Sequence, residues 1–296
     1  MAGLEPWQVF SPPAIGREPG WLGPGAPLLT RDSRICLMGS CLGRELKLGL
    51  MADGFAVLER GRDRGVLEHG SAEWERVFNT RVALQEVQRV LGRIQLATYP
   101  AGSRVIDPYR KGIAFDDEST AREGIANYCA DGQAVLEEAD ALVIMIGLSE
   151  AWIDSRTGLA FAELPPMPIW DRVSPEPILF SAEQNADHLV AAIDLVREVN
   201  PGCAVILGME PQPLHVTFSS RSVYVSDAVS KANLLLGIHG AIAARPNVHY
   251  FPAWEVVAYG PHERFDWDGR HVSEPARAEV MRTFRELFAH PGESIG

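Results

Sequence analysis

Two short segments near opposite ends of the chain carry side chains that could catalyse acyl transfer. Ser40 follows the apolar run 35–38, at a point where a buried strand gives way to a helix. The backbone N–H groups and the positive end of the helix dipole therefore face whatever the Ser40 hydroxyl attacks. Asp268 and His271 stand three residues apart, so the carboxylate can orient the imidazole and fix its tautomer. These residue types predict a serine nucleophile served by a histidine base.

Composition and charge limit the partners of the chain. It has 296 residues, of which 46% are hydrophobic, and a formal net charge of -12. That charge disfavours nucleic acid and anionic membranes, because both require clustered Lys and Arg. The longest apolar stretch, 141–148, is too short to cross a bilayer, and the first residues do not resemble a secretion signal. We therefore expect no nucleic acid, no membrane and a cytoplasmic location.

The metal-binding residue types show no ligand spacing. The cysteines are far apart, without a Cys-x-x-Cys pair, and the histidines other than His271 do not cluster in sequence. Reduced thiols are therefore expected at all four cysteines. The sequence predicts neither a metal site nor a cofactor. The four cysteines are Cys36, Cys41, Cys129 and Cys203.

Short apolar runs alternate with helical patterns along most of the chain. The runs are nearly continuous in apolar character, which is typical of parallel strands covered on both faces. They lie at 35–38, 141–146, 204–207 and 248–251, with a weaker fifth at 55–58. Helical patterns lie at 43–52, 73–92, 181–199, 226–244 and from Ser273 onward. The pattern predicts a three-layer α/β/α sandwich around a mostly parallel sheet of about five strands. Such sheets bind ligands at the carboxyl ends of their strands.

The domain organisation follows from the same pattern. Residues 1–30 are rich in Pro and Gly and predict an extended arm. Residues 31–296 are predicted to form a single α/β domain. Two segments, 100–131 and 155–180, do not fit the alternation and are predicted as irregular loop insertions. Long loops in compact domains often bind ligands, so these segments are candidates for substrate selection.

Residues 39–46, with the sequence GSCLGREL, resemble the opening motif of the GSCFA family, a bacterial branch of the SGNH (GDSL-type) hydrolase superfamily. The resemblance extends over about residues 30 to 290. It implies a flavodoxin-like fold with Ser40 as nucleophile and His271 as base, oriented by Asp268. Further blocks follow in the expected order at 78–80, 147–154, 157–158, 230–232, 250–252 and 268–273.

The donors for the oxyanion are less clearly marked. Attack on an ester creates an oxyanion that needs hydrogen-bond donors about 3 Å away, and the Ser40 N–H is one expected donor. SGNH enzymes usually add a glycine N–H and an asparagine side chain, where this chain has Asn79 and Ser149. The Asn79 amide or the Ser149 hydroxyl could donate. Other candidate oxyanion or substrate contacts are Gly39, Cys41, Gly147, Glu150 and Trp152.

Several alternatives compete with these interpretations. Cys41 is intrinsically the better nucleophile, although adjacent side chains point in different directions and only one can face His271. Ser40 could instead be a helix N-cap. Glu150 and Trp152 either contact substrate or support the fold. Glu210 precedes a proline where many family members have serine, which alters the local loop contacts.

The combined prediction is a serine-dependent acyl ester hydrolase that works through an acyl-enzyme on a small-molecule or carbohydrate acyl ester. The same residues could instead move the acyl group to a sugar or other alcohol, which is acyl transfer. A third possibility is a non-catalytic domain that binds a ligand in the same cleft. If His271 takes the proton of Ser40, the Ser40 Oγ should lie within about 3.5 Å of an imidazole nitrogen.

Overall fold

A central sheet of five parallel strands organises the computed structural model, which describes residues 28–60, 74–260 and 262–289. The strand order is β11-β10-β6-β1-β2. These strands are β1 (Arg34–Gly39), β2 (Ala56–Val57), β6 (Ala141–Ile146), β10 (Ala204–Met209) and β11 (Val248–Phe251). All five occur at the apolar runs of the sequence, and every pair is parallel, so the predicted α/β fold is confirmed.

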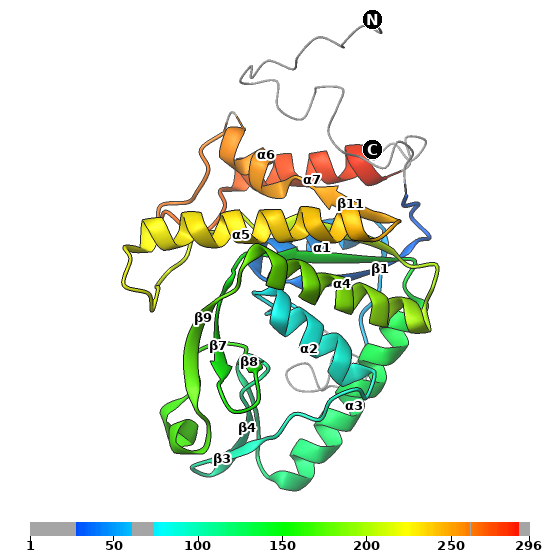
Figure 1. The fold of residues 1–296 in the computed structure, drawn as a ribbon. Helices are drawn as coiled ribbons and strands as arrows, with labels where there is room; N and C mark the ends of the chain where they lie inside the picture. The colour runs from blue at the N-terminus through cyan, green and yellow to red at the C-terminus, as the bar shows by residue number, and fades with distance from the viewer. Residues whose placement is uncertain (1–27, 61–73, 261, 290–296) are drawn as a thin grey trace, which may run out of the picture.

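Helices cover both faces of this sheet (Figure 1). One face packs against α1 (Cys41–Ala52), α6 (Ala253–Tyr259) and α7 (Glu274–Phe288). The other face packs against α2 (Thr80–Val90), α3 (Glu118–Glu138), α4 (Ala182–Val199) and α5 (Val223–Ala244). The result is the predicted three-layer arrangement. Ser40 and Glu210 directly follow β1 and β10, so both lie at the carboxyl edge of the sheet.

The segments predicted as irregular insertions contain regular structure, and that part of the prediction is wrong. Residues 100–131 contribute to an antiparallel sheet of β3 (Tyr99–Ala101), β4 (Arg104–Asp107) and β5 (Ile113–Phe115), and to the first part of α3. Helix α3 begins with a capping box between Asp117 and Thr120. This box lies within the polar run 116–120.

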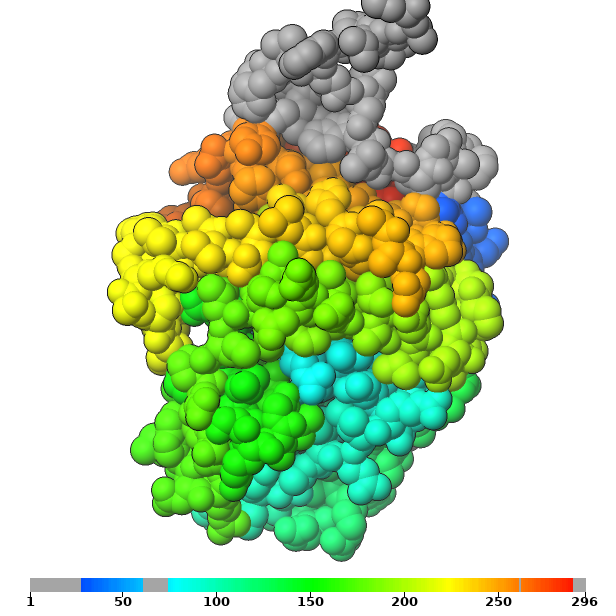
Figure 2. All heavy atoms as spheres, in the orientation of Figure 1, coloured from blue at the N-terminus to red at the C-terminus, as the bar shows by residue number. Residues whose placement is uncertain are grey.

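Residues 155–180 belong to a second antiparallel sheet. It orders β8 (Leu159–Phe161), β7 (Glu150–Asp154) and β9 (Pro175–Leu179), with a 3-10 helix over Met167–Arg172. Figure 2 shows a hollow between this green unit and the yellow segment that precedes α5. Strand β7 begins four residues after β6 ends. This small sheet therefore starts next to the carboxyl edge of the central sheet, where Ser40 lies.

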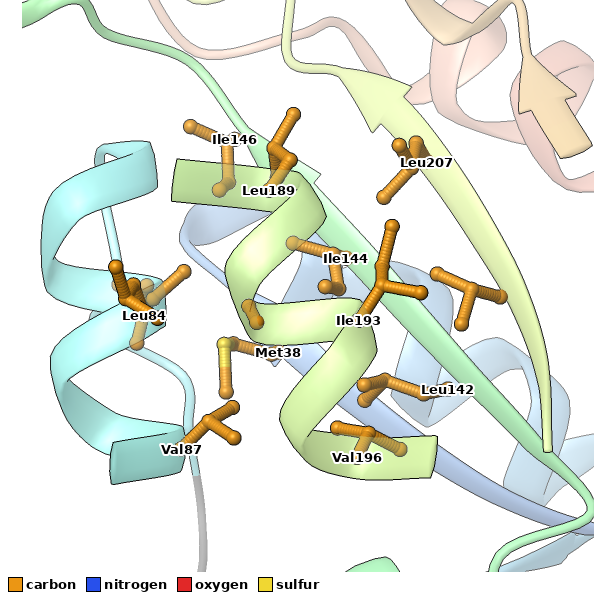
Figure 3. Packing of buried hydrophobic residues seen from close by; sticks show 14 of the residues in the cluster. Met38, Leu84, Val87, Leu142, Ile144, Ile146, Leu189, Ile193, Val196 and Leu207 are labelled. Atoms are coloured by element: carbon orange, nitrogen blue, oxygen red, sulfur yellow. The ribbon is translucent and has the colours of Figure 1, made fainter. Parts of the chain in front are cut away.

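The core confirms that the strands are buried on both faces. Along β1, Ile35 and Leu37 pack toward α1 and α7, whereas Cys36 and Met38 pack toward α2 and α4. Figure 3 shows the β6 residue Ile144 beside Ile193 of α4, and the Met38 side chain directed toward Val87 of α2. Because successive strand side chains alternate between faces, this pattern requires helices on both sides.

The helix ends follow local sequence signals. The predicted capping box of Ser181 and Gln184 opens α4, and Ser273 caps α7 with Pro275 in its first turn. Helix α2 starts at Thr80 rather than near residue 73, because Asn79 caps it by accepting from the Val82 N–H at 2.9 Å.

The N-terminal arm lies almost wholly outside the described residues. Its last part is described, where the N–H groups of Leu28 and Leu29 both donate to the carbonyl of Phe288. No helix within the described ranges combines the length and apolar character needed to cross a membrane. The single-domain organisation of 31–296 stays a prediction.

Candidate active site

Ser40 occupies the junction between β1 and α1, as the sequence predicts. It is buried, with 4% of its surface exposed, and it holds the N-cap position of α1. Its side chain makes no capping hydrogen bond to the helix. The hydroxyl is therefore not occupied by the structural role that serine most often has at this position.

The hydrogen-bond partner of the Ser40 hydroxyl is Glu210, at the end of β10. The hydroxyl donates to Oε2 of Glu210. The other carboxylate oxygen, Oε1, accepts from the backbone N–H of Ser40 at 3.0 Å and from that of Gly43 at 3.0 Å. The Glu210 side chain thus reaches across the end of β6 to the N-terminus of α1. Backbone donors and the helix dipole stabilise a negative charge there.

Glu210 is enclosed by protein. Only 1% of its surface is exposed, and burial raises its pKa above the usual range of a glutamate. The hydrogen bonds from Ser40 and Gly43, together with the nearby Lys231 charge, act in the opposite direction. A carboxylate whose pKa is raised is a stronger base than an ordinary one.

Lys231 of α5 ties together the loops behind Glu210. Its ammonium donates to the carbonyls of Gly147 at 2.7 Å, Glu210 at 2.7 Å and Gln212 at 2.8 Å. Burial lowers the pKa of Lys231 to about 8. These three hydrogen bonds fix the main chain after β6 and after β10, and hence the point from which the Glu210 side chain extends.

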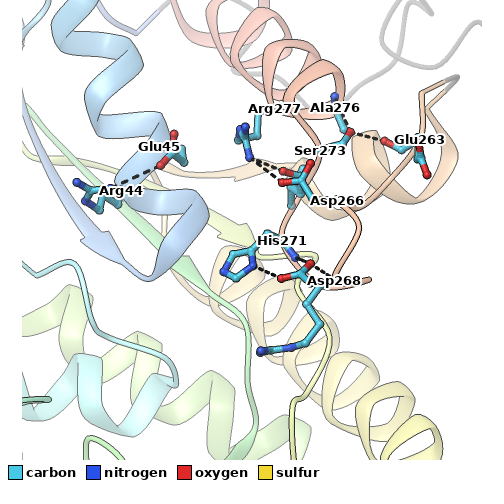
Figure 4. Close-up of polar contacts among 11 residues, drawn as sticks. Arg44, Glu45, Glu263, Asp266, Asp268, His271, Ser273, Ala276 and Arg277 are labelled. Carbon is cyan, nitrogen blue, oxygen red and sulfur yellow. Dashed lines mark hydrogen bonds and ion pairs between the residues drawn. The ribbon is translucent and has the colours of Figure 1, made fainter.

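Asp268 and His271 form a second polar unit, on the loop before α7. Asp268 Oδ2 accepts from the imidazole Nδ1, while Oδ1 accepts from the N–H groups of Arg270 at 2.9 Å and His271 at 3.0 Å. These three bonds, the Arg270 N–H first, lower the pKa of Asp268 to about 2. The Nδ1–H tautomer leaves Nε2 as the reactive nitrogen of the ring. Figure 4 shows the imidazole directed at Asp268, on the loop that leads into α7.

The expected hydrogen bond between Ser40 and His271 does not form in this structure. The Ser40 hydroxyl is held by Glu210, and the His271 ring is held by Asp268. The two residues also differ in exposure, since 55% of the His271 side chain is exposed whereas Ser40 is buried. In this structure a carboxylate at the end of a different strand accepts the hydroxyl proton instead.

The two candidate oxyanion side chains are used differently. The cap of α2 uses Oδ1 of Asn79, so its Nδ2–H groups are the part that could donate to a ligand. The Ser149 hydroxyl donates to the carbonyl of Ser230 at 2.8 Å and accepts from Asn185 at 2.9 Å. Ser149 is fully buried, and its hydroxyl joins the segment after β6 to α4 and α5.

Glu150 and Trp152 lie on β7, beside the loop that follows β10. Both carboxylate oxygens of Glu150 accept from the Thr217 hydroxyl, at 2.9 and 3.0 Å. The Trp152 ring makes edge contacts with Phe218 at 4.7 Å and with Trp170 at 6.0 Å between centroids. Its buried indole N–H has no hydrogen-bond partner among the described residues. These contacts join the small sheet to the loop that carries Glu210.

Of the remaining predicted positions, Gly39 and Gly147 are buried and Cys41 is exposed. A Cβ at Gly39 would lie 2.6 Å from the Met145 carbonyl oxygen, so only glycine lets β1 end this close to β6. Gly147 accepts from Lys231 and donates its N–H to the Phe78 carbonyl. Cys41 is exposed at the first position of α1, whereas the neighbouring Ser40 points inward.

Sequence reasoning missed the part that Glu210 and Lys231 play in this site. The departure from the family pattern at Glu210 was the available signal, but nothing in the sequence showed which residue its carboxylate would contact. The bond to Ser40 joins positions 170 residues apart.

Comparison with models of protein families identifies the family of this chain. The GSCFA family model matches residues 34–284, and the chain belongs to the GSCFA family. A search of curated proteins found no match.

Solved structures similar to this chain include acyl-transferring and ester-cleaving proteins. The salicylyl-acyltransferase SsfX3 from a tetracycline biosynthetic pathway is 13% identical with a TM-score of 0.41. The alignment covers 86% of this chain and 54% of SsfX3, so the chain spans about half the length of that protein. A carbohydrate esterase family 3 structure from Talaromyces cellulolyticus is 8% identical (TM-score 0.32, covering 85% of this chain and 94% of that one). The lipase Lip_vut3 from a goat rumen metagenome is 10% identical (TM-score 0.36, covering 88% and 99%).

Proposed function

We propose that this protein is a serine-dependent acyl ester hydrolase with Ser40 as the nucleophile. One observation carries the proposal: the Ser40 hydroxyl sits at the carboxyl edge of a parallel sheet, makes no helix cap, and donates to a buried carboxylate. Edges of this kind are where α/β proteins bind ligands. A hydroxyl bonded to a base is partly prepared to lose its proton.

His271 supplies the second acid–base group of the proposed site. Asp268 fixes its tautomer and stabilises the imidazolium form, which leaves Nε2 to exchange protons with a leaving alcohol or an attacking water. The large exposed fraction of His271 suits contact with a bound substrate. Asn79 Nδ2 is the proposed side-chain donor to the oxyanion, beside the Ser40 N–H.

The substrate class that fits the proposal is a small-molecule or carbohydrate acyl ester. Water as acceptor makes the reaction hydrolysis, and an alcohol as acceptor makes it acyl transfer. Glu150 and Trp152 are proposed as substrate contacts at the mouth of the site, because β7 rises from the edge where Ser40 lies. No metal or cofactor takes part in the proposed chemistry. The expected location is the cytoplasm.

The test compares two adjacent nucleophiles. The protein, Ser40→Ala and Cys41→Ala are assayed with p-nitrophenyl acetate and butyrate. We expect kcat/KM to fall by about 10³ or more in Ser40→Ala, and to stay within about threefold in Cys41→Ala. The reverse order would assign the nucleophile to the thiol. Adding methanol to the assay separates the acceptors, since methyl ester formation reports acyl transfer.

A further inference from the structure

We infer that the alcohol part of the substrate is a ring that carries an anionic group, and that Trp267 and Arg270 bind it beside His271. This assignment rests on the proposed function, because it takes His271 as the group that meets the alcohol oxygen of the ester. It narrows the substrate to esters of anionic ring alcohols, in which the anion is a carboxylate or a phosphate.

The loop before α7 is held as a tight turn by its own backbone. The Asp266 N–H donates to the His271 carbonyl at 2.7 Å, and the Gly269 N–H donates to the Asp266 carbonyl at 2.9 Å. Gly269 has a φ of 68°, which favours glycine. Trp267 is the first of the two central residues of this turn. The backbone therefore keeps Trp267, Arg270 and His271 within one short, ordered segment.

The first observation is the exposure of the Trp267 side chain. Its surface is 98% exposed, so the indole adds little to the packing of the fold. A tryptophan side chain covers about 150–250 Å² when a partner lies against it. Its flat face suits the face of an aromatic or sugar ring. A ring alcohol bound here would gain this contact without displacing another side chain.

The second observation is the lack of a partner for the Arg270 side chain. Its Nε is buried and has no hydrogen-bond partner among the described residues. The nearby acids bind other groups: Asp268 Oδ1 accepts from two backbone N–H groups, and Asp266 pairs with Arg277 at 3.6 Å. A buried donor without an acceptor is destabilising, so an acceptor on a ligand would be favoured. A guanidinium can donate two parallel hydrogen bonds to a carboxylate or phosphate.

The position of His271 assigns both side chains to the alcohol part of the ester. In the proposed reaction His271 gives a proton to the leaving alcohol, so the alcohol oxygen lies at its Nε2. Arg270 is its neighbour in the chain, with Cα atoms about 3.8 Å apart. Trp267 lies four residues before His271. The acyl carbon is bonded to Ser40, so the groups beside His271 meet the alcohol and not the acyl chain.

The charge of the chain makes such a contact selective. A formal net charge of -12 opposes the binding of anions over most of the surface. An arginine whose side chain is not neutralised by a neighbouring carboxylate supplies the local exception. Anionic esters should therefore be preferred only where Arg270 can reach them.

The experiment varies the charge of the alcohol part while its ring is kept. The esters are 3-acetoxybenzoate, 3-acetoxyphenyl phosphate and the neutral 3-acetoxybenzamide, and acetate release gives kcat and KM for each. The preference is kcat/KM for an anionic ester divided by kcat/KM for the amide. Its carboxylate and phosphate arms show which anion is bound. A second pair, acetylated methyl glucuronoside and its amide, replaces the aromatic ring with a sugar ring.

We expect Arg270→Gln to lower this preference about 10- to 100-fold, the scale of lost charge-assisted hydrogen bonds. The loss should appear in KM rather than kcat, because the contact is present in both the bound and the reacting ester. Glutamine keeps the backbone N–H that Asp268 accepts, so the loop should keep its shape. The control, Arg264→Gln, removes the same charge from an exposed position on the same loop. Its preference should stay within about threefold of the unchanged protein.

Trp267→Ala tests the ring contact. It should raise KM about three- to tenfold for every ring ester, whatever its charge, because a stacking contact is lost. Trp267→Phe keeps a ring and should recover most of that loss. Tyr224→Ala removes another exposed aromatic side chain, of which 85% is exposed, and should leave KM within about twofold. An unchanged KM in Trp267→Ala would contradict the ring contact.

Two results would overturn the assignment of Arg270. One is equal kcat/KM for anionic and neutral esters in the unchanged protein, and the other is an equal loss of preference in Arg270→Gln and Arg264→Gln. Hydrolysis that survives in Ser40→Ala, or no hydrolysis of any ester, would contradict the proposed function instead.

Binding of the free alcohol tests the same contact without turnover. Isothermal titration calorimetry measures the Kd of 3-hydroxybenzoate for the unchanged protein and for Arg270→Gln. We expect Kd to rise about tenfold or more in the variant. The same Kd in both proteins, or no binding to the unchanged protein, would overturn the inference even if the ester hydrolysis is confirmed.

Discussion

The two polar units of the candidate site, Glu210 with Lys231 and Asp268 with His271, are built in opposite ways. On the inner side, Glu210 and Lys231 are buried and are held by backbone groups from three separate elements. On the outer side, Asp268 and His271 lie within one loop and bind each other, and much of the imidazole is exposed. Long-range contacts hold the inner unit, whereas the outer one forms within residues 268–271. Ser40 bonds to the inner unit through Glu210.

This difference explains why the sequence shows the Asp268–His271 unit but not the Glu210–Lys231 unit. The outer unit depends on a spacing of three residues, so its motif is visible in the chain. The inner unit depends on strand order, because β6 separates β1 from β10 in the sheet. Disturbing each unit should accordingly have a different effect: the outer one should change the rate, and the inner one should also change stability.

The largest effect should come from Asp268→Asn in the outer unit. The asparagine Oδ1 can still accept from the N–H groups of Arg270 and His271, so the loop should keep its shape. Its Nδ2 would donate to the imidazole Nδ1 and favour the wrong tautomer. Hydrolysis of p-nitrophenyl acetate should therefore fall by about 10³-fold or more.

A neighbouring acid provides the control for that variant. Asp266 lies on the same loop and pairs with Arg277 at 3.6 Å. Asp266→Asn should leave the rate within about threefold of the unchanged protein. Equal losses in the two variants would mean that loop charge, and not the tautomer of His271, governs the rate.

The next effect in size should be on stability, in Lys231→Met. Methionine fills similar space but leaves the carbonyls of Gly147, Glu210 and Gln212 without their buried donor. The free energy of unfolding should fall by about 2–4 kcal/mol, measured by urea denaturation. Lys111→Met, at an exposed ion pair with Glu163, should cost less than about 1 kcal/mol. Similar losses in both would show that Lys231 does not hold the inner unit together.

Features of the fold could be predicted from the sequence where the interacting residues lie close together in the chain, and not where they lie far apart. The strands of the central sheet and the caps at Ser181 and Ser273 arise from residues close together in the chain, and they are confirmed. Helix α3 was missed because its apolar side is narrow and its capping box lies in a polar segment. The carboxylate that holds Ser40 could not be predicted, because its identity depends on how two distant strand ends meet.

The candidate site shows the same limit at Ser149. The motif placed a hydroxyl at the position where related enzymes have an asparagine, which favoured an oxyanion donor. The fold instead uses that hydroxyl between Ser230 and Asn185, on α5 and α4. A motif predicts where a side chain stands in the chain, but the packing of the neighbouring helices decides which partner it bonds.

The smallest expected effect follows from that arrangement. Ser149→Ala should lower the free energy of unfolding by about 1–2 kcal/mol through its lost hydrogen bonds. Its kcat/KM should stay within about threefold, and the exposed Ser155→Ala should change neither quantity. A 100-fold loss of kcat/KM with unchanged stability would return Ser149 to the oxyanion site.

The most direct measurement of the central claim is the position of a covalent adduct. The unchanged protein is treated with a fluorophosphonate, digested, and mapped by mass spectrometry across the peptide that contains both Ser40 and Cys41. We expect a single adduct on the Ser40 oxygen. An adduct on the Cys41 sulfur, or no adduct on this peptide under conditions where ester hydrolysis is measurable, would contradict it.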